Sequence, residues 1–214
     1  MTGTSGNMEV KAKSIAVRSR DIFMKYGIRS VSMDDISRQL GMSKKTLYQH
    51  FENKSDLVRQ VLQDSHEDFE ASIENVLSEG NNAIDDLLDI SLFIAEHMKE
   101  VNVVVTFDLQ KYYPELYREY LDKKRNFAFN YLTGNLLKGI REDLYRDDLS
   151  IELIAKLYVQ KIEDLHDPRV YDAEKISFTE VFEVMFENHI RGIANENGIN
   201  YFNERKKTLK LDQR

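Results

Sequence analysis

Residues 32–51 (SMDDISRQLGMSKKTLYQHF) place polar side chains that suit nucleic-acid binding along one short segment. The apolar spacing predicts two short helices around a turn at Gly41, where glycine adopts a left-handed backbone without steric cost. Lysine reaches phosphate or guanine, glutamine pairs with adenine, and hydroxyl groups adapt to either. This pattern is typical of a helix-turn-helix, whose second helix reads the DNA groove. The residues expected on its exposed face are Ser43, Lys44, Lys45, Thr46, Tyr48, Gln49 and His50.

Five apolar residues of this segment are expected to pack the two helices together. This apolar set consists of Ile36, Leu40, Met42, Leu47 and Phe51. Two alternatives stay open: His50 could cap the end of its helix instead of contacting DNA, and the basic residues before the segment could form a solvated face or steer DNA. Those basic residues are Lys11, Lys13, Arg18 and Arg20.

The segment from Phe23 to Val58 resembles the DNA-binding domain of the TetR family of bacterial repressors. It carries an aromatic residue and glycine at the end of a helix, Ser before Met-Asp-Asp-Ile, then Gly-Met-Ser-Lys-Lys-Thr-Leu-Tyr-Gln-His-Phe and Asn-Lys-Ser-Asp-Leu. The resemblance implies phosphate contacts at Ser32, Met33 and Lys54, and base reading by the second helix. Lys45 stands where the family often has glycine, which puts the preferred DNA sequence in doubt but not DNA binding.

The charge distribution agrees with a basic N-terminal DNA-binding region followed by a separate acidic region. Residues 1–60 contain eleven Lys or Arg and six Asp or Glu, a net charge of +5. The remaining residues carry a net charge of −12, and the whole chain −7. A basic patch attracts phosphates even on an acidic protein, so the distribution matters more than the total.

The whole chain of 214 residues is expected to be all-α, with about nine helices. It has only two prolines, and apolar residues recur at helical spacing almost everywhere. The run Val101 to Leu109 favours a strand locally, but we interpret it as a buried helix because no other strand exists to pair with it. We expect a helix-turn-helix domain of three helices at residues 1–55 and a helical effector-binding and dimerisation bundle at residues 56–214.

A palindromic operator in double-stranded DNA calls for a homodimer, because one recognition helix contacts few base pairs. The helices expected near 150–165 and 177–195 are the candidates for the interface, with ordinary core packing as the alternative. The candidate interface residues are Ile154, Tyr158, Phe182, Met185, Phe186 and His189. Residues 60–145 are expected to enclose a pocket for a small-molecule effector of unknown identity, to which no lining residue is assigned.

Several other functions are disfavoured. The chain has no cysteine, hence no disulfide, thiolate nucleophile or zinc–thiolate site. Glu163-x-x-His166 is a single metal-like pair, whereas di-iron bundles need two such pairs and further glutamates. We therefore expect no cofactor, no metal and no enzymatic activity. Without a long apolar run or a signal pattern, we expect a cytoplasmic protein without membrane contact. A helical interaction module that no longer reads DNA remains the alternative, although the basic face at residues 44–50 argues against it.

Overall fold

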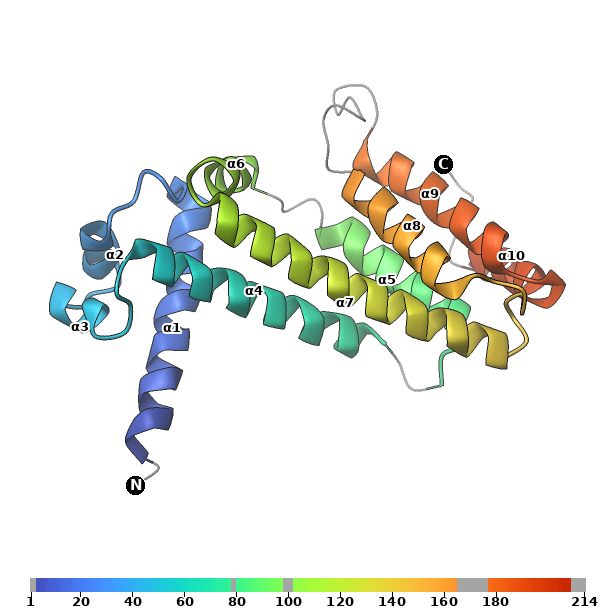
Figure 1. Cartoon of the computed structure of the whole chain (residues 1–214), viewed down its shortest axis with the longest axis horizontal. Coiled ribbons are helices and arrows are strands. Elements are labelled where there is room, and N and C mark those ends of the chain that lie inside the picture. The colour runs from blue at the N-terminus through green and yellow to red at the C-terminus, as the bar shows by residue number, and fades with distance from the viewer. Residues whose placement is uncertain (1–2, 78–79, 98–101, 165–176, 209–214) are drawn as a thin grey trace. The chain divides into compact units, whose positions relative to one another are not determined.

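The computed structural model describes residues 3–77, 80–97, 102–164 and 177–208, which are mostly helical (Figure 1). Within these ranges the chain forms ten helices and no strand, which confirms the all-α prediction. The tenth helix, beyond the nine expected, comes from the polar residues after Asn195. The helices are α1 Gly3–Tyr26, α2 Met33–Gln39, α3 Lys44–Tyr48, α4 Lys54–Val76, α5 Ala83–His97, α6 Val103–Tyr112, α7 Pro114–Arg141, α8 Ile151–Asp164, α9 Phe178–Ile193 and α10 Glu196–Thr208.

Two helices begin with the reciprocal cap that their sequences predict. The Ser32 hydroxyl accepts a hydrogen bond from the Asp35 amide (3.2 Å), and the Asp35 carboxylate accepts one from the Ser32 amide (3.0 Å). Ser177 and Glu180 repeat this arrangement at the start of α9. Each pair satisfies two backbone groups that a helix start leaves without an internal partner. These local contacts fix where α2 and α9 begin.

The valine-rich run forms α6 and not a strand. The Asn102 side chain accepts a hydrogen bond from the Val105 amide (3.1 Å) and so starts the helix. Leu109 is buried, but Val103 and Phe107 are exposed, so the expectation that this helix is buried holds for one face only. His166 of the metal-like pair lies outside the described residues.

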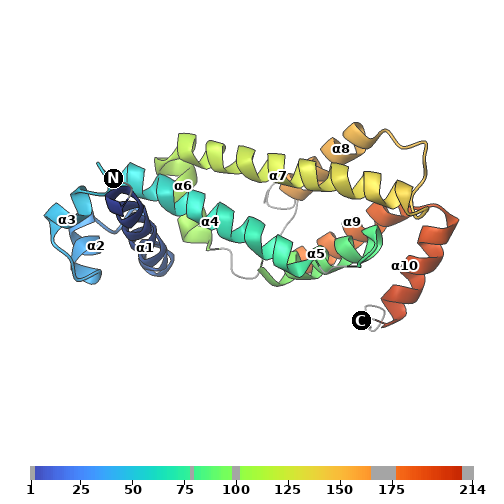
Figure 2. The ribbon, with the colours of Figure 1, turned by 90° about the horizontal axis from the view of Figure 1, so that it is seen from below.

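The chain divides into two compact units. The first contains Met1–Ala71 and Val101–Lys124, and the second contains Ser72–Glu100 and Arg125–Arg214. Two of the three divisions fall inside α4 and α7, and the third lies between α5 and α6. The expected domain boundary at 55/56 lies within the first unit. In the first unit α1, α2 and α3 lie close together (Figures 1 and 2). They share a core with α6 and the beginnings of α4 and α7.

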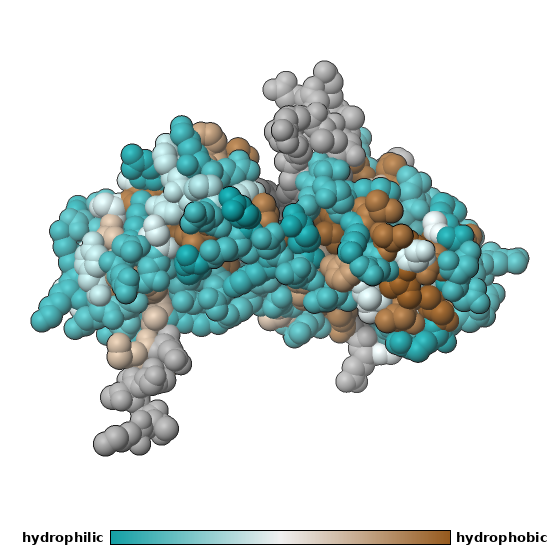
Figure 3. Space-filling view, viewed as in Figure 1, coloured by the Kyte–Doolittle hydropathy of each residue, from teal (hydrophilic) through white to brown (hydrophobic). Residues whose placement is uncertain are grey.

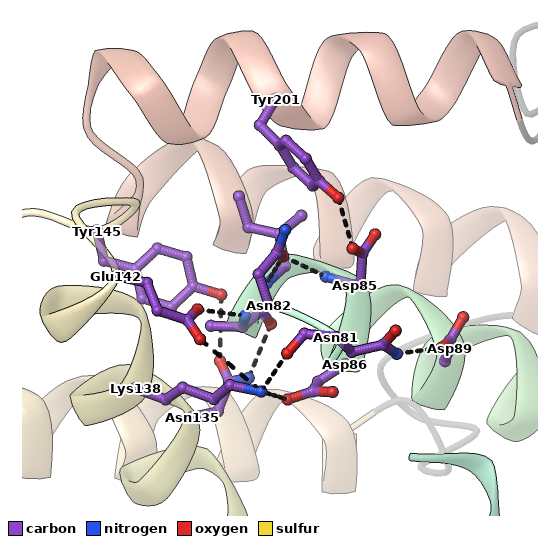
Figure 4. A network of polar contacts seen from close by, with 12 residues as sticks. Asn81, Asn82, Asp85, Asp86, Asp89, Asn135, Lys138, Glu142, Tyr145 and Tyr201 are labelled. Atoms are coloured by element: carbon purple, nitrogen blue, oxygen red, sulfur yellow. Dashed lines mark hydrogen bonds and ion pairs between the residues drawn. The ribbon is translucent and has the colours of Figure 1, made fainter. Parts of the chain in front are cut away.

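The second unit combines an apolar core with a polar network (Figure 4). Asp85 of α5 accepts hydrogen bonds from Tyr201 (2.5 Å) and Arg205 (2.6 Å) of α10. Lys138 of α7 donates to the Asp86 carboxylate at 2.6 Å. These contacts join α5 to both α7 and α10, because each buried carboxylate needs a charged or hydrogen-bonding partner. Within the described residues, no helix is long and apolar enough to cross a membrane.

Candidate nucleic-acid interface

A capped turn holds α2 and α3 in fixed register. Gly41 has a φ of +68°, the left-handed conformation expected for it, and the Met42 amide donates to the Ser37 carbonyl (2.9 Å). The helix α3 has only five residues, too few for a helix that is stable alone. Its Leu47 is completely buried, and Phe51 behind it is 3% exposed. Packing of these two side chains therefore fixes the direction in which the polar residues of α3 point.

Three of the seven predicted groove-facing residues already have partners within the protein. The Ser43 hydroxyl accepts a hydrogen bond from the Thr46 amide (3.1 Å) and lies 2.8 Å from the Thr46 hydroxyl. Lys44 forms an ion pair with Asp34 of α2, although both side chains remain exposed. These contacts stabilise the start of α3 and join it to α2.

The polar groups of the other four residues have fewer partners within the protein. Lys45, Tyr48 and Gln49 are exposed, and within the described residues their side chains form no hydrogen bond or ion pair. Tyr48 is 50% exposed. His50 is half-buried, with its ring centroid 6.5 Å from that of Phe51. An amine, a phenol and an amide thus project from one short helix.

The predicted phosphate-contacting residues differ in how accessible they are. Ser32 is exposed, whereas the Met33 side chain is buried, so only the backbone of Met33 could reach a ligand. Lys54 is half-buried, and its ammonium donates a hydrogen bond to the Ile28 carbonyl (2.5 Å). Burial lowers the pKa of the Lys54 ammonium, and the nearby Arg29 guanidinium lowers it further. Lys54 therefore anchors the segment between α1 and α2, with part of its donor capacity already used.

Arg29 is a candidate contact that the sequence reasoning did not single out. Its backbone amide donates to the buried Asp108 carboxylate (2.7 Å), which fixes the turn, and its exposed guanidinium lies 5.1 Å from the centre of the Tyr112 ring. No carboxylate in the described ranges pairs with this guanidinium. Its position three residues before the cap Ser32 is the only signal in the sequence that could have suggested it.

The basic residues of α1 are largely used inside the first unit. Lys13 pairs with Glu67 (3.5 Å), and Arg20 pairs with Asp68 (2.8 Å). The Arg18 guanidinium donates to the Leu40 carbonyl (3.3 Å). Neither of the two alternatives, a solvated face or the steering of DNA, predicted these intramolecular contacts of Lys13, Arg18 and Arg20.

The predicted interface residues on α8 and α9 divide into two groups. Tyr158, Phe182 and Phe186 are buried within the chain itself, while Ile154, Met185 and His189 are half-buried. The His189 ring stacks on Tyr158 with 3.9 Å between ring centroids. The most exposed apolar side chains of these helices are three that the sequence reasoning did not select: Leu153, Leu157 and Val184, each more than 60% exposed.

The metal-like pair gains no support from the described part of the chain. There, no three His, Asp, Glu or Cys side chains gather as metal ligands would. Glu163 instead accepts two hydrogen bonds from the Arg125 guanidinium, at 2.8 and 3.1 Å.

Comparisons with known proteins agree with this geometry. Residues 15–61 match the sequence model of the bacterial regulatory proteins of the tetR family. An uncharacterised HTH-type transcriptional regulator of Bacillus subtilis, YvaF, is 23% identical over 77% of this chain and 86% of its own length. The fatty acid metabolism regulator protein of the same organism is 21% identical over 82% of this chain and 92% of its own.

A solved structure shows the same fold over nearly its whole length. The transcriptional regulator from Cytophaga hutchinsonii superposes with a TM-score of 0.71 and 17% identity, covering 86% of this chain and 99% of its own. The family match also supports a regulator and not an enzyme. Residues 15–61 thus form a helix-turn-helix domain of the kind found in the tetR family of bacterial regulatory proteins.

Proposed function

We propose that this protein is a transcriptional repressor that binds a palindromic operator as a homodimer and is released by a small-molecule effector. The observation that carries the proposal is the set of exposed, unengaged side chains on α3: Lys45, Tyr48 and Gln49. A rigidly capped helix that presents such groups suits base reading in the major groove. Ser32, Arg29 and Lys54 border it and supply candidate phosphate contacts.

An exposed apolar surface on α8 and α9 supports the homodimer. Leu153 and Leu157 lie one turn apart on α8, and Val184 is on α9. Apolar residues gather over these two helices in Figure 3. Contiguous apolar surface of this kind is costly in water and is typical of protein interfaces. The half-buried Ile154, Met185 and His189 belong to the proposed interface, whereas Phe182 and Phe186 would support it from within the core.

The candidate effector sites in the second unit are two open depressions of its surface. One measures about 380 Å³, within the usual size range of small-molecule sites. Its lining consists of Val76, Asp89, Leu92, Phe93 and Glu96. A second, of about 220 Å³, lies between Asp86 of α5 and residues of α7. An effector that favours a dimer with wrongly spaced recognition helices lowers DNA affinity by the same factor by which DNA lowers effector affinity.

Selection of genomic fragments by the purified protein, at near-physiological salt, tests this function. Sequencing of the bound DNA is expected to recover a two-fold symmetric site whose half-sites lie about one helical turn, roughly 34 Å, apart. Recovery of no specific DNA by a folded dimer would contradict operator binding by the effector-free protein. It would favour the alternative of a module that serves another partner.

A further inference from the structure

Lys124 of α7 lies against α4, with its ammonium between two aromatic rings. The nitrogen is 5.5 Å from the ring centre of Tyr120, one turn earlier on α7, and 5.7 Å from that of Phe69 on α4. His66, one turn before Phe69, is buried, and its ring meets Tyr120 edge-on with 6.4 Å between centroids. All four residues belong to the first unit. We call them the Lys124 cluster.

Lys124 differs from the other lysines that are comparably buried. In the described ranges four lysines are half-buried, and three of them donate to oxygen atoms. Lys54 donates to a carbonyl, and Lys138 and Lys206 donate to carboxylates. Lys124 has no such acceptor among the described residues. It is thus the one half-buried ammonium of these ranges without an oxygen acceptor for its hydrogen bonds.

The nearby acidic residues have other partners. Glu70 lies 3.2 Å from the His66 imidazole, and Glu119 forms an ion pair with Arg59. Burial lowers the pKa of the Lys124 ammonium, and no neighbouring carboxylate offsets this effect. An ammonium withdrawn from water normally requires an anion close by. Ring faces attract it but leave its hydrogen-bond donors unused.

We propose that the Lys124 cluster binds the anionic head group of an effector that also has an apolar body. The ammonium supplies the charge and three donors, and the rings of Phe69 and Tyr120 pack against the apolar part. The His66 imidazole borders the head group, and burial lowers its pKa. This inference rests on the proposed function, because it assigns the effector a chemical class and a site in the first unit, as an alternative to the two depressions of the second unit.

Ligand binding without DNA tests the inference. The probes are decanoate and decyl phosphate, with decanol and decyltrimethylammonium as neutral and cationic matches of equal chain length, all below their micellar concentrations. Calorimetry on the full chain is expected to show at least tenfold tighter binding of one or both anions than of decanol. The cationic probe is expected to bind more weakly still. Preference for decanoate over decyl phosphate, or the reverse, distinguishes a carboxylate from a phosphate head group.

Three variants locate the binding site. Lys124→Met is expected to abolish the preference for anions, Lys124→Arg to retain it, and Lys123→Met, at the exposed neighbouring position, to leave it unchanged. Without ligand, Lys124→Met is expected to melt at or above the temperature of the wild type, because it removes a buried charge without a counter-ion. Equal binding of all four probes, binding of none, an undiminished preference in Lys124→Met, or its loss in Lys123→Met would overturn the inference. DNA binding is measured separately on the wild type, so the ligand-binding result can be interpreted even if the operator proposal fails.

Discussion

Replacing Leu157 by glutamate tests the proposed dimer surface at its most exposed apolar residue. Leu157 is 64% exposed within the chain, so the fold of one protomer does not depend on it. Full burial of a leucine is worth about 1.5–3 kcal/mol, so the exposed part would contribute about 1–2 kcal/mol in a dimer. Two-fold symmetry doubles the loss to about 2–4 kcal/mol, and a buried carboxylate without a partner adds to it.

The expected result is a monomer that keeps its helical content. A loss of about 3 kcal/mol weakens self-association by roughly 100-fold. Analytical ultracentrifugation over a concentration series measures the dissociation constant, and circular dichroism checks the fold. Leu137→Glu on α7 is the matched control, because Leu137 is also exposed (43%) but lies outside α8 and α9. Equal dissociation constants for wild type and Leu157→Glu, or equal weakening by both variants, would refute the assignment.

Three further predictions concern stability and base preference. Gly139→Ala is expected to lower thermal stability by about 1–3 kcal/mol, because a Cβ there would lie 2.1 Å from the Tyr145 ring; an unchanged melting temperature contradicts this. Selection from randomised operators is expected to show that Lys45→Ala changes the bases preferred at one symmetric pair of operator positions. Lys44→Ala is expected to weaken binding to all sequences alike. Identical selected sites for the wild type and Lys45→Ala would contradict base reading by Lys45. Burial lowers the pKa of His189 to about 4, so between pH 6.5 and 4 the unfolded chain binds more protons than the folded chain, and the free energy of unfolding falls as the pH decreases. Denaturant unfolding across this range is expected to show a smaller fall in His189→Leu than in the wild type. An equal fall in both proteins excludes His189 as the cause.

Local signals in the sequence predicted much of the fold. The Ser32–Asp35 and Ser177–Glu180 pairs mark helix starts because both partners lie within one helical turn. Gly41 marks the turn because its backbone conformation favours glycine. The buried role of Leu47 followed from helical spacing alone. Signals of this kind involve only neighbouring residues, so they can be read without knowledge of the tertiary structure.

The contacts that individual side chains form depend on residues that are distant in the sequence. Nothing in the spacing shows that Lys44 pairs with Asp34 or that Lys54 donates to the Ile28 carbonyl. We predicted a dimer interface on α9 because its apolar face is too wide for packing on one side only. In the structure Phe202 of α10 lies against Phe186, with 6.5 Å between ring centroids. The residues of α8 and α9 that remain exposed were therefore identifiable only once α10 was placed.

The ratio of specific to non-specific DNA affinity tests the central claim most directly. The measurement compares the selected site with a scrambled sequence, over a salt series, for the wild type and a Lys45→Ala/Tyr48→Ala double variant. We predict that the wild type prefers its site by at least about 1,000-fold near physiological salt, and that the double variant loses most of this preference while remaining folded. Its residual phosphate contacts should still give salt-dependent binding. A wild-type ratio near one, or an unchanged ratio in the double variant, would contradict base reading by α3.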